Sequence, residues 1–93
     1  MILGVCTIEL YIPGANSLKD KRKVIKSIIQ RIRNKYKVSI CELYEQDIWR
    51  RAVLGISCIS NDKNIIFKTF SGIEKFIEEG GELQISDLRT EIL

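Results

Sequence analysis

The 93 residues suffice for one domain and are too few for two, and their composition, 45% hydrophobic and 29% charged, is typical of a soluble globular chain. The absence of histidine excludes Ser-His-Asp and Cys-His catalysis. No apolar run approaches the about 20 residues that a membrane-spanning helix needs, and the N-terminus lacks the charged start of a signal peptide, so we expect a cytoplasmic protein with no membrane partner.

The net charge of +3 conceals a strong segregation of charge along the chain. Residues 17–37 contain nine of the fifteen Lys and Arg residues and a single acid, so this stretch carries +8 and the remainder carries −5. Such an asymmetry indicates an anionic partner rather than a reaction.

Residues 2–12 alternate in the manner of a β-strand, and both of its faces begin apolar. One face holds Ile2, Cys6, Ile8, Leu10 and Ile12, and the other holds Leu3, Val5, Thr7, Glu9 and Tyr11. A strand that is apolar on both faces is usually central in its sheet. Residues 13–16, Pro-Gly-Ala-Asn, then end the strand.

Residues 17–37 are predicted to form one long amphipathic helix, with Ser17 as its cap and Asp20 where a capping box places an acid. The three- and four-residue spacing of its apolar side chains predicts a buried stripe of Leu18, Ile25, Ile28, Ile29, Ile32 and Tyr36. On its flank, five cations project within about 100° of one another. These are Lys19, Arg22, Lys23, Lys26 and Arg33, and we call them the basic row.

The second half of the chain predicts two more strands, a helix and a last strand. Residues 38–44 and 49–60 form a hairpin around a turn at 45–47, with Leu54, Ile56 and Cys58 on one face. A helix capped by Asn61 or Asp62 and ended by Gly80 and Gly81 is anchored by Ile66, Phe70, Ile73 and Ile77. The last strand, from Glu82 onward, becomes irregular around Ser86 and Asp87, which suits a sheet edge.

The order βαββαβ predicts an α+β protein with the ferredoxin-like arrangement: a four-stranded antiparallel sheet with two helices on one face. We expect residues 1–93 to form this single domain.

The basic row predicts phosphate binding, and the alternative is an ordinary solvated helix face. A second candidate lies around the hairpin, where Trp49 and Tyr44 accompany Arg50 and Arg51. Bases could stack there while the arginines contact phosphates. In the alternative, which we favour, Trp49 closes one end of the core and the arginines face solvent or pair with Glu45 and Asp47.

The sheet face away from the helices is the third candidate. If it carries its apolar residues together, it is too apolar to remain exposed, and we expect a homodimer through it. The alternative is that these residues are merely scattered. The predicted interface consists of Leu3, Val5, Tyr11, Val53 and Ile59.

No cofactor or metal site is predicted. The three cysteines lie far apart in strand-like runs, with no Cys-x-x-Cys pair and no histidine to complete a metal site, so we expect Cys6, Cys41 and Cys58 to be buried and reduced. The chain also lacks a Walker phosphate loop and the aromatics of an RNA-recognition motif. Glu42, which has no second acid or base at a recognisable spacing, is interpreted as the partner of a nearby lysine or arginine.

Four segments together resemble the YlxP-like family of small bacterial proteins, and the resemblance covers nearly the whole chain. They are SLKDKR at 17–22, SICE at 39–42, WRRAVLG at 49–55 and SND at 60–62. The resemblance implies a ferredoxin-like fold. It also implies a ribosome- or RNA-associated role, since genes of this family often lie among those for translation initiation and ribosome maturation. No catalytic residues are established for the family, so it implies none here.

Our leading hypothesis is a non-enzymatic RNA-binding or ribosome-associated module that uses a basic helix at about residues 18–36, with the basic row and with Arg50 and Arg51. The alternative is a homodimeric interaction or regulatory domain whose basic helix docks an acidic protein. An enzyme or small-ligand binder is the third hypothesis, which the absence of histidine and of paired carboxylates disfavours.

Overall fold

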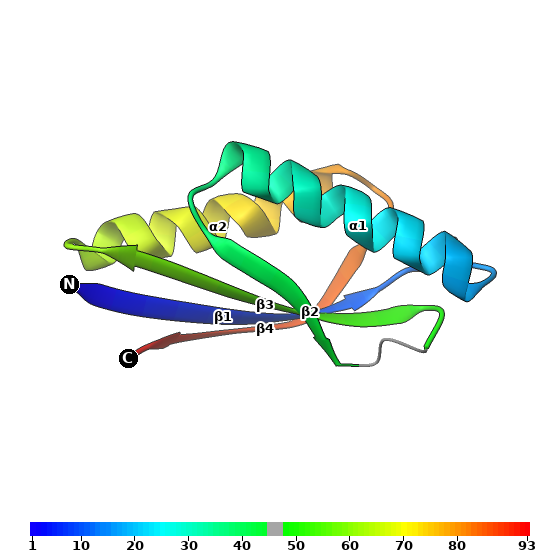
Figure 1. Ribbon diagram of the computed structural model, residues 1–93, viewed down its shortest axis with the longest axis horizontal. Helices are drawn as coiled ribbons and strands as arrows, with labels where there is room; N and C mark the ends of the chain where they lie inside the picture. Colours follow the sequence, from blue (N-terminus) through cyan, green and yellow to red (C-terminus); the bar gives the residue numbers. More distant parts are fainter. Residues whose placement is uncertain (45–47) are drawn as a thin grey trace.

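The computed structural model describes residues 1–44 and 48–93 and contains the predicted order of elements (Figure 1). The elements are β1 (Ile2–Tyr11), α1 (Leu18–Lys35), β2 (Ser39–Tyr44), β3 (Arg51–Ser60), α2 (Lys63–Glu79) and β4 (Gln84–Ile92). The predicted order is therefore confirmed, although β3 begins two residues later than expected and leaves Trp49 and Arg50 ahead of it. The turn predicted at 45–47 lies outside the described residues.

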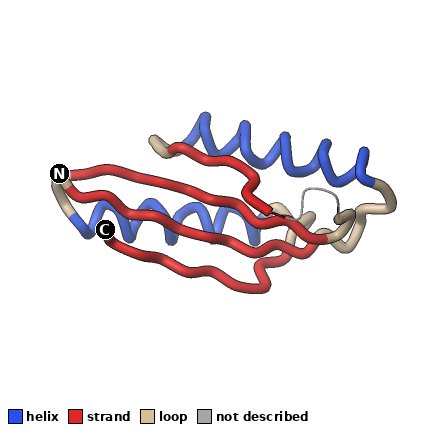
Figure 2. Tube along the Cα trace, turned by 60° about the horizontal axis from the view of Figure 1, so that its bottom comes forward, coloured by secondary structure: helices blue, strands red, loops and turns tan. Residues whose placement is uncertain are grey.

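The four strands form one antiparallel sheet in the order β2-β3-β1-β4, and both helices lie on the same face of it (Figures 1 and 2). This is the ferredoxin-like arrangement. β1 is central, with Leu3 opposite Ile59 of β3 and Val5 opposite Glu91 of β4, as its two apolar faces predicted. No helix in the described parts of the chain is both long and apolar enough to cross a membrane.

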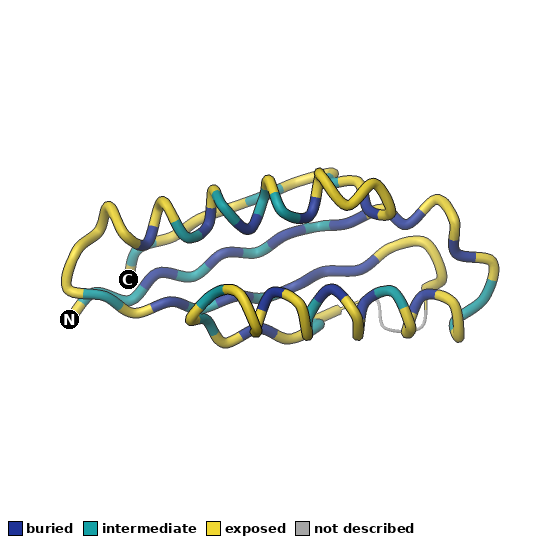
Figure 3. The backbone as a smooth tube through the Cα atoms, turned by 90° about the horizontal axis from the view of Figure 1, so that it is seen from above, coloured by how far each residue is buried: buried dark blue, intermediate teal, exposed yellow. Residues whose placement is uncertain are grey.

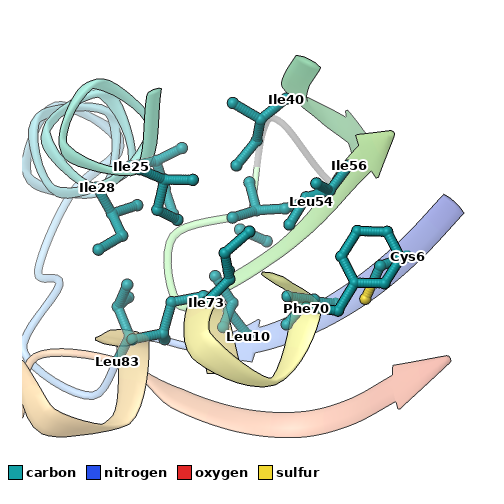
Figure 4. Packing of buried hydrophobic residues seen from close by; sticks show 14 of the residues in the cluster. Cys6, Leu10, Ile25, Ile28, Ile40, Leu54, Ile56, Phe70, Ile73 and Leu83 are labelled. Atoms are coloured by element: carbon teal, nitrogen blue, oxygen red, sulfur yellow. The ribbon is translucent and has the colours of Figure 1, made fainter. Parts of the chain in front are cut away.

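The core fills the space between the helices and the sheet (Figure 4). Along β1 the even-numbered residues point into it, and the buried side of each helix faces the strands (Figure 3). All four predicted anchors of α2 are buried. In α1 the predicted stripe is fully buried at Ile25, Ile28 and Ile32 and half-buried at Leu18, Ile29 and Tyr36.

Local interactions fix the start of both helices and the end of α2. The Oγ atom of Ser17 accepts a hydrogen bond from the backbone N–H of Asp20 (3.1 Å), and the Asp20 carboxylate accepts one from the N–H of Asn16 (3.1 Å). The predicted cap is confirmed, with the acid reaching one residue further back than in a standard capping box. Asp62 caps α2, and Gly81, at a φ of 75°, turns the chain after it.

Two β-bulges interrupt the sheet. In β4 the register shifts opposite Glu9 and Leu10, and the Ser86 hydroxyl there donates to the Glu9 carbonyl (3.1 Å), which confirms the irregularity predicted at this edge strand. In β2 the shift falls between Glu42 and Tyr44. The bulged residue, Leu43, covers Gly55 so closely that a Cβ atom added there would lie 2.7 Å from the Leu43 Cδ1 atom.

Candidate functional site

The outward side of α1 is rich in exposed cations. Of the nine cations in residues 17–37, eight are exposed, and Lys21 alone is buried. All five members of the predicted basic row are exposed. α1 lies beside β2, whereas α2 covers β1, β3 and β4. The basic row therefore borders the β2 edge of the molecule.

Arg33 has a structural role that the sequence did not indicate. Its Nη2 atom donates a hydrogen bond to the carbonyl of Ile40 in β2 (3.0 Å). This contact joins the C-terminal half of α1 to the edge strand and fixes the direction of the guanidinium group. Because a guanidinium has five N–H donors, one bond to a carbonyl leaves donors for an anion.

A buried ion pair lies beneath the basic row. The Lys21 Nζ atom is 3.0 Å from the Glu42 Oε2 atom, with a Lys21 side chain that is 0% exposed and a Glu42 side chain that is 17% exposed. The interpretation of Glu42 as the partner of a nearby lysine is confirmed. Lys21 itself was missed, although a signal exists: it stands four residues before Ile25 and seven before Ile28, which places it on the buried stripe.

A groove of about 390 Å³ runs between α1 and β2 above this pair. Its cations are Arg22, Lys26 and Arg33, and its apolar wall comes from Ile25 and Ile29. Gln30 and Glu42 complete the lining. Three of the five members of the basic row therefore converge on one surface depression.

The remaining cations of α1 face the other helix. The Arg31 guanidinium lies 5.9 Å and the Lys35 ammonium 4.9 Å from the centre of the Phe76 ring in α2. Tyr36 meets the same ring edge to face at 6.3 Å. These distances are typical of cation–π contacts, so both cations contribute to packing between the helices.

The two arginines of the hairpin candidate, Arg50 and Arg51, lie in different places. The Arg50 Nε atom donates to the carbonyl of Ala15 (3.0 Å), which brings Arg50 to the turn that precedes α1. Arg51 lies opposite Tyr11, on the sheet face away from the helices, and is thereby separated from the basic row. Pairing of these arginines with Glu45 and Asp47 falls outside the described residues.

The prediction that Trp49 closes the core is wrong. Its side chain is 51% exposed, because Trp49 lies in the turn before β3 rather than within the strand. Tyr44, at the other end of the hairpin connection, is 65% exposed. The two aromatics therefore present ring surface to solvent in separate places, Trp49 in the turn before β3 and Tyr44 on the open face of the sheet.

The open sheet face carries apolar side chains in part as predicted. Ile59 and Tyr11 are exposed, and Leu3 and Val5 are half-buried. Val53 was wrongly assigned to an exposed interface: it lies on this face but is only 5% exposed, since the bulge in β2 sets Tyr44 opposite it and Leu43 beside it. Leu43 and Tyr44, both exposed, extend the apolar surface instead.

The three cysteines are free, but they differ in exposure. Cys6 and Cys58 are buried as predicted, and burial raises the pKa of the Cys6 thiol. Cys41 is exposed, contrary to the prediction. It lies opposite Gly55 on the open sheet face, where no helix covers it.

Comparison with known proteins extends the sequence resemblance. The family model described as "Protein of unknown function (DUF503)" matches residues 3–90. The uncharacterized protein YlxP of Bacillus subtilis (strain 168) is 37% identical over 97% of this chain and 98% of its own length. These matches confirm the predicted resemblance.

Two de novo designed proteins share the fold. One, Foldit4, superimposes over 96% of this chain and 96% of its own, with a TM-score of 0.61 at 16% identity. The other, LFR1 1, was designed with a ferredoxin fold and superimposes over 100% of this chain and 84% of its own with a TM-score of 0.57 at 13% identity. At such low identity the likeness concerns the backbone arrangement alone, and it agrees with the ferredoxin-like topology of the sheet.

Proposed function

The chain belongs to the DUF503 family of proteins of unknown function, and we propose that it is a non-enzymatic RNA-binding, ribosome-associated module that contacts RNA phosphates through α1. The observation that carries this proposal is the exposed charge of α1. Eight of the nine cations in residues 17–37 are exposed, five of them in the basic row, and the one acid of this stretch, Asp20, is engaged at the helix cap.

Lys19, Lys23 and Lys26 supply the main contacts. All three are exposed, and they rise along one side of the helix at spacings of four and three residues. Lysine ammonium groups bind phosphate as point charges, and such contacts give affinity without reading sequence. If each neutralises one phosphate of a single strand, log Kobs falls with log salt at a slope of about −2.

The direct test is binding of the purified protein to small ribosomal subunits and to their naked RNA across a range of salt concentrations. We expect saturable binding with the slope above. Reversing Lys19, Lys23 and Lys26 to Glu is expected to weaken it more than about tenfold at low salt, because three attractive contacts become repulsive.

The chain offers a matched control in α2. Lys63→Glu, Lys68→Glu and Lys75→Glu change the net charge equally, on exposed positions of the other helix. RNA binding through α1 predicts a much smaller loss for this control. Equal losses would mean that net charge alone attracts RNA. No binding of the wild-type protein at low salt would refute the proposal, and α1 would then be tested for an acidic partner protein.

A second candidate function, homodimerisation, is favoured by the open sheet face. Leu43, Ile59 and Tyr44 are exposed there, beside the half-buried Leu3 and Val5. The same face carries both signs of charge along β4, where Arg89 pairs with Asp87 at 3.3 Å. In a two-fold contact between identical copies, the same surface of each copy meets the other. An apolar strip flanked by positive and negative side chains suits such a contact, because the strips can pack together and opposite charges can pair.

Light scattering coupled to size-exclusion chromatography tests this candidate at micromolar concentration. The wild-type protein is expected to have the mass of two chains, and Ile59→Asp the mass of one. Ile65→Asp is the control, since Ile65 is an exposed isoleucine of α2 on the opposite side of the molecule. A wild-type protein with the mass of one chain would exclude the dimer.

A further inference from the structure

The groove between α1 and β2 combines charge with an apolar wall, and the two together suggest a more selective ligand than phosphate alone. Lys26 and Arg33 stand along its rim, with Arg22 nearby on the same helix. Ile29 is half-buried there, so part of its side chain remains open to a ligand. Both features occur within one depression of about 390 Å³.

The ion pair below the groove keeps its charge positive. Glu42 lines the groove, and an uncompensated carboxylate there would repel an anion. Lys21, 3.0 Å away, compensates it, so Lys26 and Arg33 can present positive charge to an anion in the groove. Arg33 is oriented in advance by its bond to the Ile40 carbonyl, which lowers the entropy lost when it binds.

A double helix and a single strand would meet this groove differently. In a duplex the bases are stacked inside, and the backbone presents phosphates and sugars to a protein. In a single strand, an unstacked nucleotide can place its phosphate on the cations and its base against an apolar or guanidinium surface. The groove offers both kinds of surface, whereas Lys19 and Lys23 offer charge alone.

We infer that this groove binds one unpaired nucleotide of single-stranded RNA, with the phosphate against Lys26 and Arg33 and the base against Ile29. The inference rests on the proposed function and specifies its substrate as single-stranded rather than double-stranded RNA.

The test compares fluorescence anisotropy of labelled oligouridine with that of a labelled RNA duplex of equal length. The wild-type protein is expected to bind the single strand more tightly. Ile29→Ala should weaken binding of the single strand about fivefold and leave duplex binding unchanged. Val24→Ala is the matched control, because Val24 is a half-buried aliphatic residue on the other flank of α1 and should change neither.

A second variant probes the charged half of the groove. Arg33→Gln loses the positive charge, and its shorter side chain, which ends two bonds before the Nη2 position, also gives up the bond to the Ile40 carbonyl. It should reduce the magnitude of the salt slope for oligouridine by about 0.7, the contribution of one phosphate contact on a single strand. Thermal melting of each variant establishes that it is folded.

The possible outcomes separate this inference from the proposed function. If the wild-type protein binds RNA but Ile29→Ala behaves like Val24→Ala, or weakens both RNAs equally, the groove is not the binding site and phosphate contact by α1 stands. Equal affinity of the wild-type protein for both RNAs would also refute binding of an unpaired nucleotide in the groove. If the wild-type protein binds neither RNA, the proposed function itself is refuted.

Discussion

Replacing Lys21 with methionine tests whether the buried ion pair holds α1 against the edge strand. Methionine keeps most of the length and the apolar stem of the buried side chain but removes the ammonium group 3.0 Å from Glu42. The carboxylate, only 17% exposed, is then left without this counter-ion. Removing one partner of a buried pair costs about 3–5 kcal/mol, and the remaining solvent contact of Glu42 brings our expectation to about 2–3 kcal/mol.

The assay is urea unfolding followed by far-ultraviolet circular dichroism. Lys21→Met is compared with Glu42→Met, with the double variant and with Lys23→Met. In the double variant no charge is buried alone, so it should regain most of the lost stability. Lys23 is exposed, and its replacement should change the free energy of unfolding by less than about 0.5 kcal/mol.

Two results would contradict this reasoning. A loss below about 1 kcal/mol for Lys21→Met would place the pair among exposed ion pairs, which contribute little. A double variant as unstable as the sum of the two single variants would show that the two side chains do not act on each other.

Two further predictions concern the sheet. Gly4→Ala should lower the free energy of unfolding, followed by thermal melts, by about 1–3 kcal/mol, because the added Cβ atom would collide with the Ile66 side chain. Gly14→Ala is the control: no atom lies within 4 Å of its added Cβ atom, so it should change the free energy of unfolding little. Brief maleimide treatment followed by mass spectrometry should label the exposed Cys41 and spare Cys6, which is buried and has a raised thiol pKa; labelling of Cys6 in the folded protein would contradict the structure.

Periodicity along the chain predicted the elements and most of the core. Ile66, Phe70, Ile73 and Ile77 recur at helical spacing, and all are buried. β1, whose two faces both begin apolar, lies between β3 and β4 as expected of a central strand. The helix anchors and the central strand could be predicted because both depend on the local pattern of apolar residues, which can be read from one sequence.

The errors arose where burial depends on another part of the chain. Val53 is buried because a bulge in the neighbouring strand moves Leu43 and Tyr44, and nothing in the sequence around Val53 indicates that bulge. Cys41 is exposed because its strand lies at the sheet edge and it faces away from the helices. Alternation in a strand separates its two faces but does not reveal which of them a helix covers.

In the structure, some cations of the candidate site hold α1 in place and others are available to bind phosphate. Lys21 and Arg33 hold α1 to β2, and Arg50 holds the turn before it. Lys19 and Lys23 lie beyond these contacts and offer point charges to phosphate. Because point charges do not distinguish one nucleic acid from another, selectivity must come from a place where charge and apolar surface meet. On α1 that place is the groove beside Ile29, where Arg33 takes part in both the fold and the proposed binding.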